Sequence, residues 1–166
     1  VYKRQNKNSI FNLLENISKN QTIIMPTTNS AYGGGQGGVE CDENSPLNPI
    51  SKYALDKVEI EKKIMDRENT ISLRLATVFG MSPRMRFDLL VNDFVRRAYL
   101  DRFIVLFESH FKRNYIHVKD VANCFEHCLE NFSQMKTNIY NGGLSDAKLS
   151  KKELCERIKK YKPYFV

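Results

Sequence analysis

The chain has no apolar run long enough to cross a bilayer, no internal repeat and no Cys-x-x-Cys pair among its 4 cysteines. Its first residues are polar and lack the apolar core of a signal peptide, so secretion is not indicated. Unpaired thiols are typical of a reducing compartment. The sequence therefore predicts a cytoplasmic globular protein of 166 residues without a membrane segment. Because it begins at Val1 and not at Met, its true start can lie upstream.

One group of residues invites a metal interpretation. Cys124, His127 and Cys128 can share a single face of a helix. A zinc site needs further ligands, and no second pair occurs elsewhere in the sequence. We therefore interpret the three as packed helix residues and predict no metal site.

The net charge is +7, with an isoelectric point near 9.2. Nucleic-acid binding would require the basic residues to cluster, but they are spread along the chain. The one cluster, at residues 151–160, alternates with Glu153 and Glu156, as a solvated helix face does. We predict a site for anionic small molecules and no nucleic-acid partner.

Helical and strand-like patterns alternate with short connections. Helices are expected at residues 8–18, 49–66, 87–99, 120–132 and 150–160, and strands at 22–25, 71–78, 103–107, 115–118 and 138–140. Asn48 before Pro49 predicts the start of the second helix, and Ser150 with Glu153 predicts a capping box at the last. This order predicts an α/β fold with a mostly parallel sheet.

Tyr53 and Lys57 lie four residues apart on a predicted helix, so their side chains share a face. A phenol with a pKa of about 10 is a poor base, and a nearby ammonium favours its ionised form. Bringing the phenol pKa near 7 requires about 4 kcal/mol of differential stabilisation. Such a pair also occurs by chance on amphipathic helices, so by itself it leaves a purely structural role open.

Neighbouring segments favour the chemical interpretation. The strand at residues 22–25 leads to Thr28, at the sheet edge where α/β proteins place ligands. The strand at 71–78 ends at the same edge. A hydroxyl there can hydrogen-bond a substrate oxygen while a phenolate moves its proton.

Four motifs occur in order. They are Thr-Thr-x-x-x-Tyr-Gly from Thr27, Asn-Pro-x-x-x-Tyr-x-x-x-Lys from Asn48, Leu-Arg-x-x-x-x-x-Gly from Leu73, and Arg-x-Tyr-Ile-His-Val-x-Asp-Val-Ala from Arg113. Together they resemble the extended short-chain dehydrogenases/reductases of the NAD-dependent epimerase/dehydratase family, which includes UDP-glucose 4-epimerase. The resemblance runs from about residue 8 to the C-terminus and implies a Rossmann-like doubly wound parallel sheet.

The resemblance implies a role for each matching residue. Tyr53 would be the catalytic acid/base, Lys57 would lower its pKa and bind the nicotinamide ribose, and Thr28 would be the catalytic hydroxyl. The backbone of Thr77, Val78 and Phe79 would face the nicotinamide. NAD or NADP would be the cofactor, and the full-length enzyme would be a homodimer.

For the substrate, the resemblance implies a sugar nucleotide. Arg113 matches an arginine that binds the diphosphate, which suits the guanidinium geometry. Arg84 and Arg86, in the loop before the helix at 87–99, are expected to join it. His117 is expected to be structural.

Two departures narrow the chemistry. Many 4,6-dehydratases follow the threonine with Asp-Glu, whereas Asn29 and Ser30 follow Thr28, which disfavours dehydration. Epimerases often carry Asn where Thr77 stands. Epimerase and reductase therefore both remain open.

Gly33, Gly35 and Gly38 match G-x-G-x-x-G, but an acidic, proline-terminated segment follows instead of the required helix. We interpret this run as a loop.

The family's true fingerprint would lie upstream of residue 8. We thus expect one incomplete domain, with residues 1–80 forming the latter half of the Rossmann sheet and 81–166 mainly a substrate-binding subdomain. Residues 1–166 alone should bind NAD(P) weakly, and an inactive chain that only binds substrate or serves assembly is the alternative.

Overall fold

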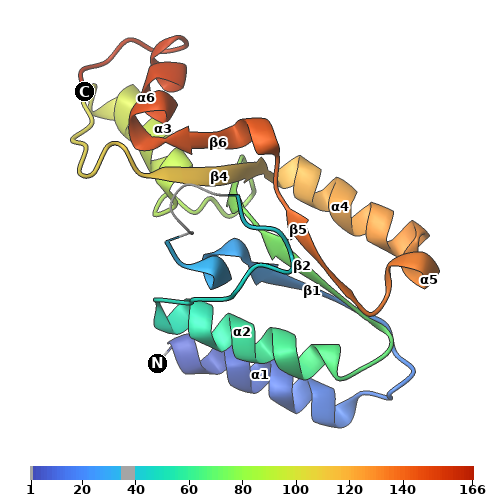
Figure 1. Cartoon of the computed structure of the whole chain (residues 1–166). Helices are drawn as coiled ribbons and strands as arrows, with labels where there is room; N and C mark the ends of the chain where they lie inside the picture. Colours follow the sequence, from blue (N-terminus) through green and yellow to red (C-terminus); the bar gives the residue numbers. More distant parts are fainter. Residues whose placement is uncertain (1, 35–39) are drawn as a thin grey trace. The chain divides into compact units, whose positions relative to one another are not determined.

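The computed structural model describes residues 2–34 and 40–166, in two units (Figure 1). The first unit comprises Val1–Ala76 and Asn123–Gly142, and the second comprises Thr77–Ala122 and Gly143–Val166. The predicted boundary near residue 80 falls close to the first division at Ala76. The first unit also includes the later segment Asn123–Gly142, whereas the prediction divided the chain at a single boundary.

A three-stranded parallel sheet forms the centre of the first unit. Its order is β1 (Ile23–Thr28), β2 (Thr70–Leu75) and β5 (Asn138–Gly142). In the register, Thr27 lies opposite Arg74, and Arg74 lies opposite Asn141. All residues of β2 are buried, because this strand has a neighbour on each side. The α/β fold with a partial Rossmann-like parallel sheet is thus confirmed.

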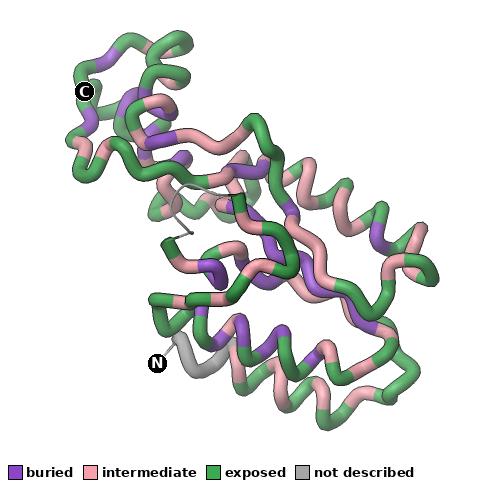
Figure 2. The backbone as a smooth tube through the Cα atoms, in the orientation of Figure 1, coloured by how far each residue is buried: buried purple, intermediate pink, exposed green. Residues whose placement is uncertain are grey.

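Two helices pack beside each other in this unit, α1 (Tyr2–Asn16) and α2 (Lys52–Met65). The apolar positions Ala54, Val58, Ile60 and Ile64 are buried, and Figure 2 shows the buried residues of α2 on one side of the helix. Helical spacing brings these positions to one stripe, which packs on β1 and β2.

The start of α2 differs from the expectation. Ser51 is the N-cap, and its hydroxyl accepts a hydrogen bond of 3.1 Å from the backbone N–H of Ala54. The prediction that Asn48 caps the helix and Pro49 opens it was wrong. A serine with β-region backbone supplies the same acceptor three residues later.

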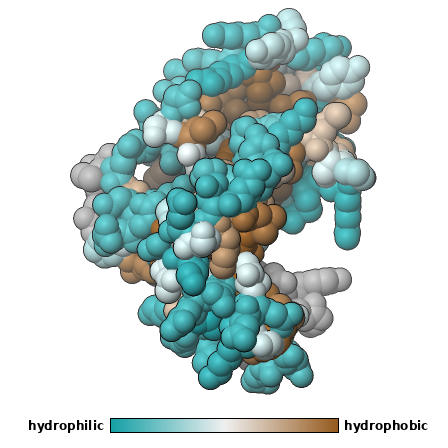
Figure 3. All heavy atoms as spheres, turned by 90° about the vertical axis from the view of Figure 1, so that its right-hand side faces the viewer, coloured by the Kyte–Doolittle hydropathy of each residue, from teal (hydrophilic) through white to brown (hydrophobic). Residues whose placement is uncertain are grey.

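Three helical segments complete the first unit. The 3-10 turn η1 (Asn29–Tyr32) follows β1 directly, and α5 (Phe132–Met135) precedes β5. The longer α4 (Val118–Glu130) contains the division between the units at Ala122. Viewed from the side on which α4 and α5 lie, hydrophobic residues reach the surface among hydrophilic ones (Figure 3).

The second unit has its own small sheet. Strand β3 (Thr77–Phe79) pairs parallel with β4 (Lys112–His117), which pairs antiparallel with β6 (Lys148–Ser150). The helices are α3 (Leu90–Leu100) and α6 (Lys151–Lys159), with a 3-10 turn η2 (Ser145–Ala147). The core of this unit consists of Val91, Phe94, Ala98, Ile104, Tyr115, Leu154, Cys155 and Tyr164. The capping box of Ser150 and Glu153 is confirmed.

Two strand predictions were wrong. The expected strand at residues 71–78 is divided at Ala76, and its two parts pair in different sheets. The expected strand at 103–107 contributes only a single bridge, from Phe103 to Phe165. Arg102 and Glu108 both have positive φ, so the chain turns at each end of that segment.

Among the described residues, none of the helices combines the length and the apolar character that crossing a bilayer requires.

Candidate active site

Thr28 is the last residue of β1, at the carboxyl edge of the parallel sheet. It is 7% exposed, and its Oγ1 accepts a hydrogen bond of 3.2 Å from the backbone N–H of Ser30. Thr28 is therefore the N-cap of η1. The strand is longer than the sequence predicted, so Thr28 belongs to the sheet itself and not to a following loop.

Tyr53 and Lys57 lie in the first two turns of α2. The Tyr53 side chain reaches solvent, with 43% exposure, so it is not a core residue. Lys57 is half-buried, and its Nζ donates a hydrogen bond of 2.9 Å to the carbonyl oxygen of Pro26 in β1. Burial lowers the pKa of the Lys57 ammonium. All three predicted catalytic residues belong to the first unit, and two lie on the helix that packs against β1.

A buried ion pair between Glu61 of α2 and Arg74 of β2 was not foreseen. The Arg74 guanidinium donates to both carboxylate oxygens of Glu61, with Nη2 at 2.7 Å from Oε1 and Nε at 3.1 Å from each oxygen. Both side chains are almost fully buried. Burial works against the charged form of Arg74, but the hydrogen bonds and charge of Glu61, together with Tyr32, raise the pKa of this arginine. Each charge of the pair thus has a partner of opposite charge in the interior.

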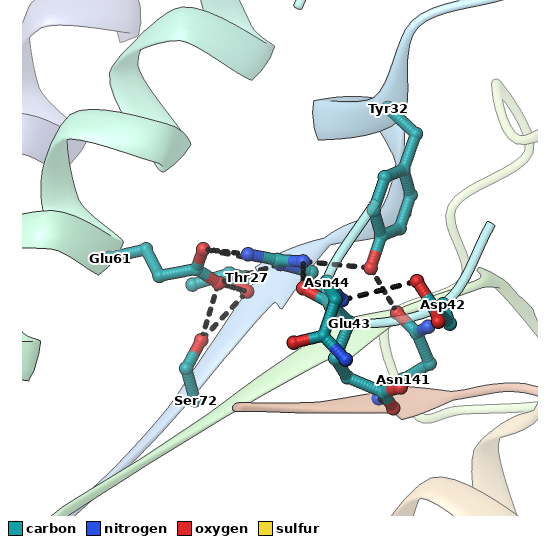
Figure 4. Close-up of polar contacts among 9 residues, drawn as sticks. Thr27, Tyr32, Asp42, Glu43, Asn44, Glu61, Ser72 and Asn141 are labelled. Atoms are coloured by element: carbon teal, nitrogen blue, oxygen red, sulfur yellow. Dashed lines mark hydrogen bonds and ion pairs between the residues drawn. The ribbon is translucent and has the colours of Figure 1, made fainter. Parts of the chain in front are cut away.

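Two hydroxyl groups also form hydrogen bonds with Glu61 (Figure 4). Thr27 Oγ1 and Ser72 Oγ lie 3.0 and 2.7 Å from Glu61 Oε2 and 3.0 Å from each other. Helix α2 thereby contacts β1 through Glu61 as well as through Lys57.

On its other side, Arg74 contacts the end of η1 and the segment that follows it. Its Nη1 donates to the Tyr32 hydroxyl at 2.7 Å and to the carbonyl oxygen of Glu43 at 3.1 Å. The Tyr32 hydroxyl donates to Asn141 Oδ1 at 2.7 Å, and the Asn141 N–H donates to the Glu43 carboxylate at 2.7 Å. Figure 4 shows Tyr32, Glu43 and Asn141 converging on this point.

A signal for this pair was present in the sequence. Arg74 is the one charged residue in an otherwise buried strand pattern, so it requires an acidic partner. Glu61 lies four residues after Lys57 and eight after Tyr53, which puts it on the same helix face.

The predicted cofactor-contacting residues Thr77, Val78 and Phe79 form β3, in the second unit, and are half-buried. A side chain at Gly80 would come within 2.8 Å of His117 Nε2, and Gly80 has a φ of 127°. The His117 ring lies edge-on to Phe79, with ring centroids 5.3 Å apart, and its Nδ1 accepts from the Lys119 N–H. These contacts agree with a structural role for His117.

The predicted substrate-binding arginines lie in the second unit too. Arg113 is exposed on β4, where it lies opposite Leu149 of β6. Arg84 is exposed in the loop before α3, and Arg86 forms two hydrogen bonds with Asp88, at 2.8 and 2.7 Å. This contact lowers the pKa of Asp88 to about 2. That the three arginines together form one anion-binding subsite remains a prediction.

Cys124, His127 and Cys128 do lie together on α4. With Met135 and Tyr140, among others, they line a cavity of about 290 Å³ in the first unit. Burial raises the pKa of the Cys128 thiol, and Cys124 adds to this effect. Within residues 2–34 and 40–166, no group of three His, Cys, Asp or Glu side chains is placed to hold a metal ion.

Comparison with known proteins decides the family. The model of the NAD dependent epimerase/dehydratase family matches residues 2–143. The chain belongs to this family.

Among curated relatives, a protein of Bacillus subtilis (strain 168) named "Uncharacterized UDP-glucose epimerase YtcB" is 28% identical over 106 residues. This match covers 60% of the chain and 32% of the relative.

Two solved structures share the fold. A dTDP-glucose 4,6-dehydratase from Bacillus anthracis in complex with NAD is 18% identical, with a TM-score of 0.78 over 96% of this chain and 54% of that one. A Thermus thermophilus UDP-glucose 4-epimerase in complex with NAD is 22% identical, with a TM-score of 0.69 over 87% of this chain and 50% of that one. The family member described here thus spans about half the length of the solved structures that it matches.

Proposed function

We propose that this chain supplies the Thr28, Tyr53 and Lys57 site of an NAD(P)-dependent sugar-nucleotide epimerase or related oxidoreductase. The observation that carries the proposal is the contact from Lys57 to the carbonyl of Pro26, which ties the helix bearing Tyr53 to the strand that ends at Thr28. Family membership supports this chemistry, because the two motifs that hold these residues fall within the matched region.

The residues present fit the nicotinamide end of such a cofactor. A half-buried ammonium at a sheet edge is a suitable donor to a ribose hydroxyl, and burial has already lowered its pKa. Lys57 and Tyr53 would hold the ribose, and the backbone of Thr77, Val78 and Phe79 would contact the nicotinamide. NAD is bound in the related dehydratase and epimerase structures. When bound, NAD(P) would accept a hydride from the sugar.

The chain's own residues would handle the proton. Tyr53, as phenolate, would take the proton from a sugar hydroxyl as the carbon is oxidised, and Lys57 would favour that ionised form. Thr28 would hold the same oxygen through its hydroxyl. An epimerase would then reverse these steps on the other face of the sugar.

For the substrate, we propose a sugar nucleotide whose diphosphate is bound by Arg113, with Arg84 as a second cation. A related protein, MoeE5, has been solved with UDP-glucose and NAD, with a TM-score of 0.72. The exposed guanidinium of Arg113 leaves its donors accessible to a diphosphate. We further propose that residues 1–80 and 81–166 divide the work between catalysis and substrate binding, and that the active enzyme is a cytoplasmic homodimer.

A chimera tests the proposal. The cofactor-binding half of the Thermus thermophilus epimerase would be joined ahead of residues 1–166, and conversion of UDP-glucose would be followed by chromatography. Thr28→Val and Lys57→Met should each lower turnover by about 100-fold, as expected when a group acting in proton transfer is lost.

Thr70→Val is the matched control for Thr28→Val, because Thr70 is fully buried and its hydroxyl has no hydrogen-bond partner in the described structure. Equal turnover in all four proteins would contradict the proposal. Substrate binding without turnover would support the inactive alternative.

A further inference from the structure

The buried pair of Glu61 and Arg74 contacts residues on both sides of Thr28 in the sequence. Glu61 binds the hydroxyl of Thr27, immediately before Thr28. Arg74 binds the hydroxyl of Tyr32, four residues after Thr28. The short stretch that carries Thr28 is therefore attached at both ends to one ion pair.

The contacts of Glu61 with Thr27 and of Arg74 with Tyr32 are short and buried. Thr27, Tyr32, Glu61 and Arg74 are each less than 9% exposed, so water does not compete for these contacts. The Tyr32 hydroxyl accepts from Arg74 and donates to Asn141, which leaves it no freedom to rotate away. Thr27 lies directly opposite Arg74 in the sheet register, so the pairing of β1 with β2 fixes Thr27 relative to the arginine that binds Tyr32.

The same pair also fixes the helix. Glu61 is one turn beyond Lys57 on α2, and these two residues contact Thr27 and Pro26, which are consecutive in β1. Sliding of α2 along β1 would break a buried charge-assisted hydrogen bond, so this contact opposes it.

We propose that Glu61 and Arg74 are positioning residues, which set Thr28 relative to the helix that carries Tyr53 and Lys57. This inference rests on the proposed function, which makes Thr28 a catalytic residue. How firmly Thr28 is held can be measured without cofactor or substrate. The pair acts on Thr28 through Thr27 on one side and through Tyr32 on the other.

Two single-atom or near-isosteric changes test the proposal in residues 1–166, without removing the ion pair. Tyr32→Phe deletes the hydroxyl that Arg74 binds, and Thr27→Val deletes the hydroxyl that Glu61 binds. Tyr115→Phe and Thr70→Val are matched controls, since both hydroxyls are buried and have no partner in the described structure. NMR would record the order parameter of the Thr28 methyl group and the exchange rate of the Ser30 amide, which donates to Thr28 Oγ1.

We expect Tyr32→Phe and Thr27→Val each to speed exchange of the Ser30 amide by about five- to tenfold, as for one lost hydrogen bond, and to lower the Thr28 methyl order parameter. Amides of Ile71 and Leu73 in the core should exchange as in the unchanged chain, which separates a local effect from general destabilisation. The two controls should leave Thr28 and Ser30 unchanged.

Unchanged Thr28 and Ser30 signals in both test variants would overturn the proposal, as would equal effects in the controls. A positive result combined with an inactive chimera would keep the positioning role and count against the proposed function.

Discussion

The Nζ of Lys57 lies 2.9 Å from the carbonyl oxygen of Pro26, two residues before Thr28. This contact uses one of the three donors of the ammonium and leaves the others for different partners. It also explains why Lys57 is half-buried, although it lies within two turns of the exposed N-terminal end of α2. The lysine thus connects the helix of Tyr53 with the strand of Thr28.

Lys57 should titrate below its ordinary pKa of 10.5, since burial disfavours its charged form. The folded state then binds this proton less tightly than the unfolded chain does. The free energy of unfolding should therefore rise with pH between the lowered pKa and 10.5, and fall as the pH drops through the lowered pKa. NMR titration of the Lys57 side-chain carbons measures this pKa. A Lys57 pKa at or above 10.5 would contradict the expectation.

The cap of α2 gives a second prediction. Ser51→Ala should destabilise the chain by about 1 kcal/mol, because the N–H of Ala54 loses its acceptor. Asn48→Ala is the control, and it should change the free energy of unfolding by less than about 0.5 kcal/mol. Urea denaturation followed by circular dichroism compares the two. A larger loss in Asn48→Ala would restore the helix start that the sequence favoured.

The buried ion pair gives a third prediction. Glu61→Gln or Arg74→Met should each cost about 3–5 kcal/mol, because the remaining charge is left unpaired in the interior. Combining both changes should cost less than the sum of the two, since the partners interact directly. Arg97→Met removes a partly exposed pair with Asp93 and should cost less than about 1 kcal/mol. Additive losses in denaturation midpoints would show that the Glu61–Arg74 contact is absent in solution.

The sequence predicted the helices α1, α2, α3, α4 and α6, the strands β1, β4 and β5, and the capping box at Ser150, and it put Thr28 just after a strand. These features depend on the local sequence pattern and on hydrogen bonds between residues that are close in sequence. The division at Ala76 was not predictable, because a continuous apolar run does not say which strand pairs with each half. The segment at 103–107 has strand-like residues, but in the structure only Phe103 finds a partner, Phe165, which lies far away in the sequence.

The placement of the candidate site residues was predictable only where it depends on local geometry. Tyr53 and Lys57 are four residues apart, so helical geometry alone puts them on one face. The partners of Arg74 come from three other segments, at Tyr32, Glu43 and Glu61. The lone charge in a buried strand indicates that Arg74 needs an acidic partner, but only the fold brings all three segments to it.

Arg113 gives a fourth prediction, on substrate binding. Arg113→Ala should weaken binding of UDP-glucose by about 2 kcal/mol, or roughly 30-fold, as for a lost charge-assisted contact to the diphosphate. Arg157→Ala, which removes another exposed arginine of the second unit, is the control. Isothermal titration calorimetry measures both, and equal affinities would exclude Arg113 from the substrate site.

The central claim is that Tyr53 moves the proton of the sugar hydroxyl. The most direct measurement is the kcat of the chimeric enzyme for UDP-glucose with Tyr53→Phe, which removes one hydroxyl and keeps the ring. We predict a fall in kcat of at least about 100-fold with little change in the affinity for UDP-glucose, because general acid/base catalysis contributes about that much or more. A Tyr53→Phe enzyme that turns over as fast as the unchanged chimera would contradict the claim.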